Sequence, residues 1–376
     1  MPNFDFDEMQ QMVTDGAIGA ISLDTSIFDQ FACNLDSPSL EALEQFVGSS
    51  VQVILTDVVL GEVRSHLAKS ATEATARLTM ALKDFSRSRR GRRIALKKAA
   101  ELLEVSADIA GEVDAWMTQY LEQVHAVTLT AGEFVSPDLL LADYLAANPP
   151  FENTKAKKAE FPDAIALMEL ERWAATHQKY VLAVSKDKGW TSFAEKSEWV
   201  LTMEDLTSAL GLFNRTDAHI VERTAALLRD SEKFQLGSEM SDVLQSFVDD
   251  LSPWVDAESP FQFYADYYGA ALKEWEPPLV ADFTVIESDT DSVTMTTKVT
   301  LTVTAEADFN FYVHDTGDDI SIGGTYIEKD ISLDVPIVVK VARESGPDDA
   351  AASMAYETQR SISLNFGYVE PDAEED

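Results

Sequence analysis

The stretch "AIGAISLDTSIF", Ala17 to Phe28, decides the fold of the N-terminal half of this chain. It begins with a short apolar run that ends at Asp24, which predicts a buried strand followed by a turn. A second apolar run, Val51 to Leu55, precedes the start of a helix that carries Glu62. A buried strand followed by a helix is the repeating unit of an α/β fold.

The same alternation continues to about residue 215. The pattern is helical almost throughout from about residue 65 to 125, which predicts a helical insertion. After the loop "ANPPFENTK" comes a helix that opens at Asp163, followed by the strands "YVLAVS" and "WVLT" and the helix "MEDLTSALGLF". Short apolar strands between helices favour a parallel sheet that is flanked by helices on both faces. We therefore expect one α/β domain over residues 1–215.

Residues 216–376 have a different pattern. Helical patterns over Asp217–Arg229, Ser241–Asp250 and Phe261–Trp275 predict a helical segment over residues 216–278, which Pro277 and Pro278 end. Beyond it, "DSVTMTTKVTLTVTAEADFNFYV" alternates with period two, and "DISLDVPIVVKV" and "SISLNFGYV" also resemble strands. These runs predict an antiparallel β domain over residues 279–376, with one face toward solvent and an acidic tail.

The composition narrows the class of protein. The chain has 376 residues and a single cysteine, Cys33, which excludes an internal disulfide and a thiolate zinc cluster. We expect Cys33 to be a small core side chain, and the five scattered histidines carry no predicted function. No apolar run approaches the roughly 20 residues of a membrane span, and the N-terminus lacks the pattern of a signal peptide. The expected location is the cytoplasm, with no membrane partner.

The charge is strongly acidic and uneven. The net charge is −37, yet the segment "KDFSRSRRGRRIALKK" is basic. Such a run is often only a solvated helix face, and its functional interpretation is a surface on the insertion that contacts phosphates. The candidate nucleic-acid contacts are Arg87, Arg89, Arg90, Arg92, Arg93, Lys97 and Lys98, with Lys155, Lys157 and Lys158 as a second group.

Four acids occupy comparable positions beside the predicted strands. Asp24 ends the first strand, Glu62 lies on the helix after the second, Asp163 opens a helix, and Asp187 follows "VLAVS". Each one alone is also an ordinary helix cap or surface acid. In open α/β sheets, however, the functional site lies at the carboxyl ends of the strands. Four acids at that edge would repel one another unless a cation neutralises them, and oxygen ligands favour Mg²⁺ or Mn²⁺.

Four motifs resemble those of the PIN domain, a family of metal-dependent nucleases. They are "SLDTSIF", "VVLGEV", "EFPDAIAL" and "VLAVSKDKGW", and they occur in the family's order over roughly residues 17 to 210. The resemblance is greatest to larger PIN-like members with a helical insertion. It implies that Asp24, Glu62, Asp163 and Asp187 are metal ligands, and that Ser185 is the small hydroxyl residue before the last acid. Many relatives have a further acid after this position, where the present chain has Lys188, Gly189 and Trp190, and Glu160 could compensate.

The resemblance implies divalent-metal-dependent hydrolysis of phosphodiester bonds, with RNA a better expected substrate than single-stranded DNA. It also implies that a homo-oligomer is a reasonable expectation. Two other roles remain open. One is a non-catalytic scaffold that keeps the fold and binds nucleic acid or protein. The other is a toxin or phage-defence effector that the acidic C-terminal region, or a regulatory protein bound to the C-terminal β domain, restrains.

Overall fold

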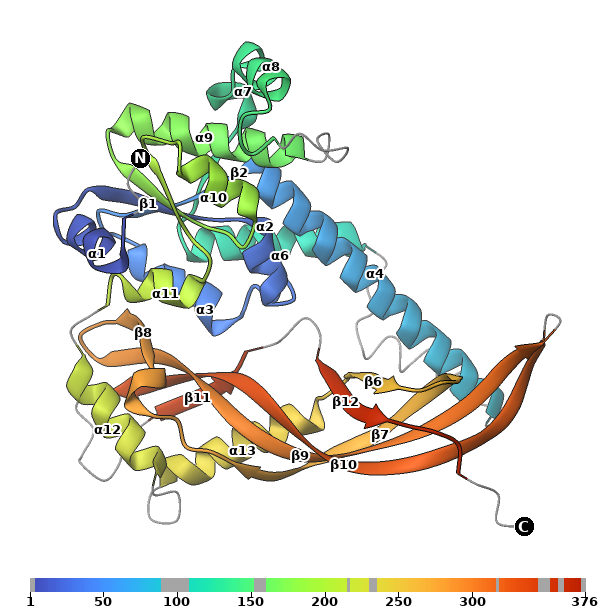
Figure 1. The fold of residues 1–376 in the computed structure, drawn as a ribbon. Helices are drawn as coiled ribbons and strands as arrows, with labels where there is room; N and C mark the ends of the chain where they lie inside the picture. Colours follow the sequence, from blue (N-terminus) through green and yellow to red (C-terminus); the bar gives the residue numbers. More distant parts are fainter. Residues whose placement is uncertain are drawn as a thin grey trace. The chain divides into compact units, whose positions relative to one another are not determined.

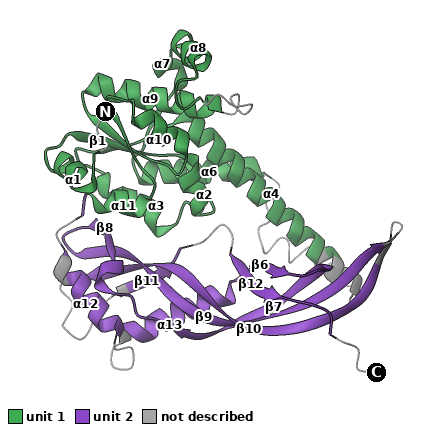
Figure 2. Cartoon of the chain, in the orientation of Figure 1, with its two compact units in different colours: residues 1–212 green, residues 213–376 purple. Residues whose placement is uncertain are grey.

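The computed structural model describes residues 4–88, 108–151, 160–214, 217–229, 235–315, 318–343, 352–357 and 362–372. The chain divides into two compact units, Met1–Leu212 and Phe213–Asp376 (Figure 2). The first contains the α/β sheet and the second an antiparallel sheet with its own hydrophobic core. No helix among the described residues is long and apolar enough to cross a membrane.

Unit 1 is built on a five-stranded parallel sheet, as the sequence predicts. The strand order is β3-β2-β1-β4-β5. Every residue of β1 is buried, and so are the last four of β2 and of β4, which explains why these strands are continuous apolar runs. The strands are β1 (Ile18–Leu23), β2 (Gln52–Thr56), β3 (Val127–Leu129), β4 (Tyr180–Val184) and β5 (Val200–Met203).

Helices cover both faces of this sheet (Figure 1). On one face, α9 (Phe161–His177) packs on β2, β4 and β5. On the other, α11 (Leu206–Gly211) packs on β4 and β5, and the 3-10 helix η1 (Ala42–Phe46) packs on β2. The remaining helices of unit 1 are α1 (Phe6–Thr14), α2 (Thr25–Gln30), α3 (Pro38–Glu41), α4 (Asp57–Ser88), α6 (Ile109–Gln123), α7 (Ala131–Phe134), α8 (Pro137–Ala146) and α10 (Lys188–Ala194).

The predicted helical insertion corresponds to the long helix α4 and to α6, which packs against it. Residues 89–107, which hold most of the basic segment, lie outside the described residues. The short strand β3, directly after α6, was not predicted, because only one of its three residues is buried and it has no apolar run.

The strand order reverses at β1. The chain builds outward from β1 through β2 to β3, and β4 then pairs with the opposite edge of β1, with Leu23 beside Val184. Connections that leave adjacent strands in opposite directions open a crevice at the carboxyl ends of those strands. Residues just after β1 and β4 therefore occupy the position where doubly wound sheets bind ligands.

Unit 2 is an antiparallel sheet of order β11-β10-β9-β7, and β8 also pairs with β9. Its centre is the long hairpin of β9 (Ser292–Asp315) and β10 (Asp318–Ala342) (Figure 1). The helix α13 (Gln235–Asp249) packs on β7 and β11 and against α12 (Ala218–Arg229). The other elements are β6 (Trp254–Glu258), β7 (Gln262–Trp275), η3 (Val280–Asp282), β8 (Thr284–Ser288), β11 (Ala352–Tyr356) and β12 (Ser363–Tyr368).

The period-two pattern of β9 produces the expected core. Val293, Met295, Val299, Leu301 and Val303 are all fully buried, and they face the same hydrophobic core as residues of α12 and α13. Because successive side chains of a strand point to opposite faces, the intervening positions belong to the other face of the sheet. The prediction of an antiparallel sheet in this half of the chain is confirmed.

Two expectations for this half are wrong. The segment Phe261–Trp275 was expected to be helical, but residues 262–275 form β7, whose burial alternates along most of its length. Its apolar side chains pack on β9 and α13, so tertiary pairing overrides a local pattern that also fits a helix. The last predicted strand, β12, runs parallel to β6 in a separate two-stranded sheet. The predicted divisions at residues 215 and 278 stay predictions.

Candidate functional site

Asp24 lies at the point where the strand order reverses. It directly follows β1 and is the N-cap residue of α2, and its backbone N–H donates to the Val184 carbonyl (2.9 Å). Its side chain is only 5% exposed. Two hydroxyls donate to its Oδ2 oxygen, Ser26 Oγ at 2.5 Å and Ser185 Oγ at 2.7 Å. The carboxylate is therefore held in one orientation by groups from two neighbouring strand ends.

Asp187 is tied to the same network from the end of β4. Its backbone N–H donates to Ser185 Oγ (3.0 Å), so one hydroxyl connects Asp24 to the loop that carries Asp187. The exposed Asp187 side chain caps α10 by accepting the Gly189 N–H (2.6 Å). A Cβ atom on Gly189 would lie 2.8 Å from Asp187 Oδ1 and 3.2 Å from Pro150 Cβ, so a glycine lets this carboxylate approach closely.

Glu62 joins the group through α2. It lies on α4, half-buried, and Thr25 Oγ1 donates to its Oε2 oxygen (2.6 Å). Because Thr25 is the residue after Asp24, this bond fixes Glu62 beside the first acid. Glu62 had been assigned to the site because it follows the second strand, and the structure places it at the same edge of the sheet.

Asp163 comes from the first turn of α9. The Trp190 Nε1–H donates to its Oδ1 oxygen (2.9 Å), and the Trp190 side chain is fully buried. The indole thus fixes the carboxylate from α10, the helix that Asp187 caps. The charges of Asp24, Asp187 and Glu62 all act on Asp163, so the structure places these three predicted acids near it.

Residues 21–190 match a family model described as PIN domain. This segment of the chain is a PIN domain. PIN domains are in general metal-dependent nucleases, so the family implies a divalent metal ion and a nucleic-acid substrate. No curated protein and no solved structure matches the chain. Unit 2 lies outside the matched segment and is unassigned.

Two of the four acids of the PIN domain site have raised pKa values. Burial is the largest cause that raises the pKa of Asp163 to about 6, and the charges of Asp24, Asp187 and Glu62 add to it, against the Trp190 hydrogen bond, which lowers it. Burial also raises the pKa of Asp24, although the Ser26 and Ser185 hydroxyls oppose this shift. Both acids are therefore harder to ionise than free carboxylic acids.

Among the described residues, no Lys or Arg forms an ion pair with any of these four acids of the PIN domain. The donor set consists of carboxylate and hydroxyl oxygens, which are the ligands that hard divalent cations prefer. Acids whose like charges act on one another, without a fixed protein cation among the described residues, fit a divalent metal ion. The residues present therefore suit the ion that the family implies.

The other predicted site residues are less well placed or lie elsewhere. Glu160 is the N-cap residue of α9, three residues before Asp163, and its side chain makes no capping hydrogen bond to that helix. Arg87 lies near the end of α4, but its side chain is outside the described part of the chain. The predicted contacts Arg89, Arg90, Arg92, Arg93, Lys97, Lys98, Lys155, Lys157 and Lys158 are also outside it.

Sequence reasoning missed three side chains that organise this site. Ser26 and Thr25 follow Asp24 directly, and a hydroxyl next to a site acid is a signal that could have identified them. Trp190 was noticed only because it occupies a position near which many relatives carry an acid. The structure shows that it has a role of its own, since it is the hydrogen-bond donor to Asp163.

Proposed function

We propose that the PIN domain hydrolyses phosphodiester bonds of RNA, or of single-stranded DNA, with Mg²⁺ or Mn²⁺ held by Asp24, Glu62, Asp163 and Asp187. The observation that supports this most is the convergence of four like charges with no Lys or Arg partner among the described residues. A structural cluster of buried acids would need a fixed cation to offset the repulsion.

The chain's own residues supply the rigidity that such a site needs. Ser26 and Ser185 orient Asp24, Thr25 orients Glu62, and the indole of Trp190 orients Asp163. When bound, divalent ions activate a water molecule and neutralise the charge that develops on the phosphate oxygens. Because each carboxylate is already oriented, little reorganisation accompanies ion binding.

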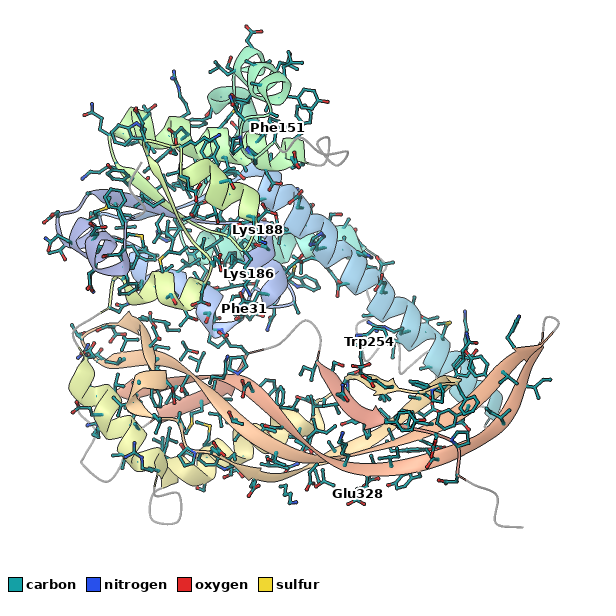
Figure 3. All side chains as sticks on the ribbon, viewed as in Figure 1. Phe31, Phe151, Lys186, Lys188, Trp254 and Glu328 are labelled. Carbon is teal, nitrogen blue, oxygen red and sulfur yellow. The ribbon has the colours of Figure 1, made fainter. Side chains whose placement is uncertain are left out.

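Two lysines beside the site offer contacts for the phosphates of the substrate. Lys186 and Lys188 flank Asp187 and are both exposed, and both side chains lie near the end of β4 (Figure 3). The Lys186 backbone N–H donates to Ser26 Oγ (3.1 Å), so the loop that carries them is tied to the acidic cluster. We include these lysines among the substrate contacts, together with the predicted basic segment.

A matched pair of variants tests the function. Asp187 and Asp205 are both N-cap residues whose carboxylates accept a backbone N–H, at 2.6 Å from Gly189 and at 2.7 Å from Ser208. Asn is as good a cap as Asp, so Asp→Asn keeps either helix start and removes only a charge. We expect Asp187→Asn to lower Mn²⁺-dependent cleavage of labelled single-stranded RNA by about 100-fold or more, and Asp205→Asn to leave it unchanged.

Equal cleavage by the two variants would overturn the proposed site. No cleavage of RNA or DNA by the wild-type chain at saturating Mn²⁺ would favour the scaffold alternative instead. That alternative is supported by Lys188, Gly189 and Trp190, which stand where many relatives carry a further acid. A scaffold would still bind single-stranded nucleic acid, and a salt-dependent affinity without cleavage would identify it. The toxin or defence role, the homo-oligomer, the regulatory partner and the cytoplasmic location stay predictions.

A further inference from the structure

A second cluster of metal-ligating side chains lies one helical turn from the acidic site. On α2, Asp29 follows Thr25 by four residues, and on α4, His66 follows Glu62 by four residues. Residues four apart lie on the same face of a helix. The Thr25–Glu62 contact (2.6 Å) is therefore followed, one turn further along both helices, by a contact between Asp29 Oδ1 and His66 Nδ1 (2.8 Å).

Cys33 completes this cluster. Its Sγ lies 3.5 Å from Asp29 Oδ1, and the thiol, the imidazole and the carboxylate all present ligand atoms within 4.8 Å of one another. Among the described residues, this is the one group of three or more His, Cys, Asp or Glu side chains with that spacing. The chain turns sharply here: Ala32 and Cys33 both have a φ of 54°, and the Cys33 N–H donates to the Phe28 carbonyl (2.8 Å).

The spacing suits a tetrahedral ion. Metal bonds of about 2.0 to 2.3 Å place the ligand atoms of a tetrahedral Zn²⁺ roughly 3.3 to 3.8 Å apart. The Cys33–Asp29 distance lies in this range, and the His66–Asp29 distance needs to lengthen by about half an ångström. His66 and Asp29 are 40% and 21% exposed, so both side chains can make this adjustment. Cys33 is only 5% exposed and is fixed.

The cluster borders a pocket that can supply the remaining position. Cys33 lines a pocket of about 430 Å³ within unit 1, together with Asn34, Trp116, Gln119 and Gln123. Leu67, the neighbour of His66, lines it too. Three protein ligands and an open side are the arrangement of zinc sites that keep a water molecule or a small ligand as the fourth partner.

We propose that Asp29, Cys33 and His66 form a Zn²⁺ site that is distinct from the acidic site and binds a softer ion. Sulfur, nitrogen and oxygen together select Zn²⁺ or Co²⁺ rather than Mg²⁺. Binding replaces the thiol proton of Cys33, which is released to solvent, with the metal. A Cys–His pair for nucleophilic catalysis fits less well, because the Cys33 thiol contacts the Asp29 carboxylate, whereas such a pair needs the imidazole within hydrogen-bond reach of the thiol.

The first test uses Co²⁺ as a spectroscopic probe in the full-length chain. A cobalt–thiolate bond gives a charge-transfer absorption that carboxylate ligands cannot produce, so it reports only on Cys33, the one cysteine. We expect one equivalent of Co²⁺ to produce this band, and Cys33→Ser or His66→Ala to abolish it or weaken Co²⁺ affinity by more than about tenfold. Two matched controls, His177→Ala on α9 and Asp187→Asn at the acidic site, should keep the band.

The second test measures protection of the same thiol. Zn²⁺ should slow alkylation of Cys33 by iodoacetamide by at least about tenfold in the wild type and in Asp187→Asn, but not in His66→Ala. Circular dichroism verifies that each variant is folded. The proposal is overturned if folded wild-type protein shows no cobalt–thiolate band, or if His66→Ala retains full protection. Either result would leave a hydrogen-bonded triad without metal, and neither would alter the expectation for nuclease activity.

Discussion

Asp24 in unit 1 and Asp217 in unit 2 are both buried acids, 5% and 3% exposed, but the charges around them have opposite sign. Asp217 accepts two hydrogen bonds from the Arg343 guanidinium, at 2.6 and 3.0 Å, and one from Ser288. Asp24 also accepts serine hydroxyls, but its charged neighbours are acids. One carboxylate is neutralised by the protein and the other is not.

The difference separates an acid that the protein pairs with a cation from one that, among the described residues, has only acids as charged neighbours. The Asp217–Arg343 pair connects the start of α12 to the end of β10. In this partly buried ion pair, the guanidinium supplies both a counter-charge and two hydrogen bonds to the buried carboxylate, so no further cation is needed. The cluster around Asp24 lacks such a partner among the described residues, which fits the divalent ion that we propose for it. Burial alone therefore does not distinguish these two acids; the sign of the neighbouring charges does.

The largest expected effect is on the paired acid. Asp217→Asn leaves the Arg343 guanidinium without its carboxylate, and we expect it to lower the free energy of unfolding of unit 2 by about 2 to 3 kcal/mol. Urea unfolding in the presence of EDTA measures this change. In the same experiment, Asp24→Asn should leave the free energy of unfolding unchanged or higher, because it removes repulsion between like charges. The contrast between the paired and the unpaired acid would fail if urea unfolding, monitored by circular dichroism, showed an equal loss of stability in both variants.

A second prediction concerns Glu169, a fully buried acid on α9. Burial, with a contribution from the Asp57 charge, raises the pKa of Glu169 to about 8, so this acid is neutral at pH 7 and needs no cation. A folded-state pKa above the unfolded value means that stability is lost as pH rises from about 4.5 to 8. We expect Glu169→Gln to raise the free energy of unfolding by about 1 to 2 kcal/mol at pH 9 and to have no effect at pH 4.

Urea unfolding at both pH values measures this difference. A gain of the same size at pH 4 would show that the effect comes from packing and is unrelated to ionisation. Glu171→Gln on the same helix is a useful comparison, because burial also raises the pKa of Glu171, while its hydrogen bond from the Ser197 hydroxyl lowers it and the charge of Glu198 has the smallest effect.

A third prediction concerns Asp163, whose pKa of about 6 makes it ionised at pH 8. Here too the folded-state pKa exceeds the unfolded-state value. The contribution of Asp163 to stability is therefore present near pH 4 and is lost as pH rises through 6. Asn keeps the acceptor for the Trp190 indole and removes the charge. In EDTA at pH 8 we expect Asp163→Asn to be more stable by about 1 kcal/mol, a value reduced for partial exposure.

Added Mn²⁺ should reverse this order. The wild type gains stability by binding the ion, whereas the variant gains less, so the difference in melting temperature shrinks or changes sign. Two results together would contradict this prediction: Mn²⁺ leaves the wild-type melting temperature unchanged, and Asp163→Asn is no more stable than the wild type in EDTA. They would mean that these acids neither bind the ion nor destabilise the fold by repelling one another.

The smallest expected effect is that of a methyl group at Gly189. The added Cβ of Gly189→Ala would crowd Asp187 Oδ1 at 2.8 Å and Pro150 Cβ at 3.2 Å. We expect the Asp187 carboxylate to shift by a few tenths of an ångström and metal-dependent cleavage to fall about three- to tenfold, with little change in melting temperature. Gly132→Ala on α7, where a Cβ meets no atom within 4 Å, is the matched control. Equal activity of the two variants would show that cleavage tolerates a shift of Asp187.

The sequence alone was sufficient to predict the structural features that depend on short segments of the chain. β1, β2 and β4 are continuous apolar runs because both faces of a parallel sheet are covered, so their positions and the acids after them could be predicted. β7 was mistaken for a helix because its apolar residues fit both periods, and only its pairing with β9 decides between them. Trp190, and the meeting of Cys33 with His66, depend on the packing of helices far apart in sequence.

The hydrogen bond from Ser185 to Asp24 spans 161 positions of the chain. Parallel pairing of β1 with β4 closes a very long loop, and such contacts form late in folding. At a synthesis rate of about 5 to 20 residues per second, Ser185 is made roughly ten to thirty seconds after Asp24. During translation, the acids therefore remain dispersed until most of unit 1 has left the ribosome. The proposed metal site is therefore incomplete while the messenger RNA is still being read through that unit.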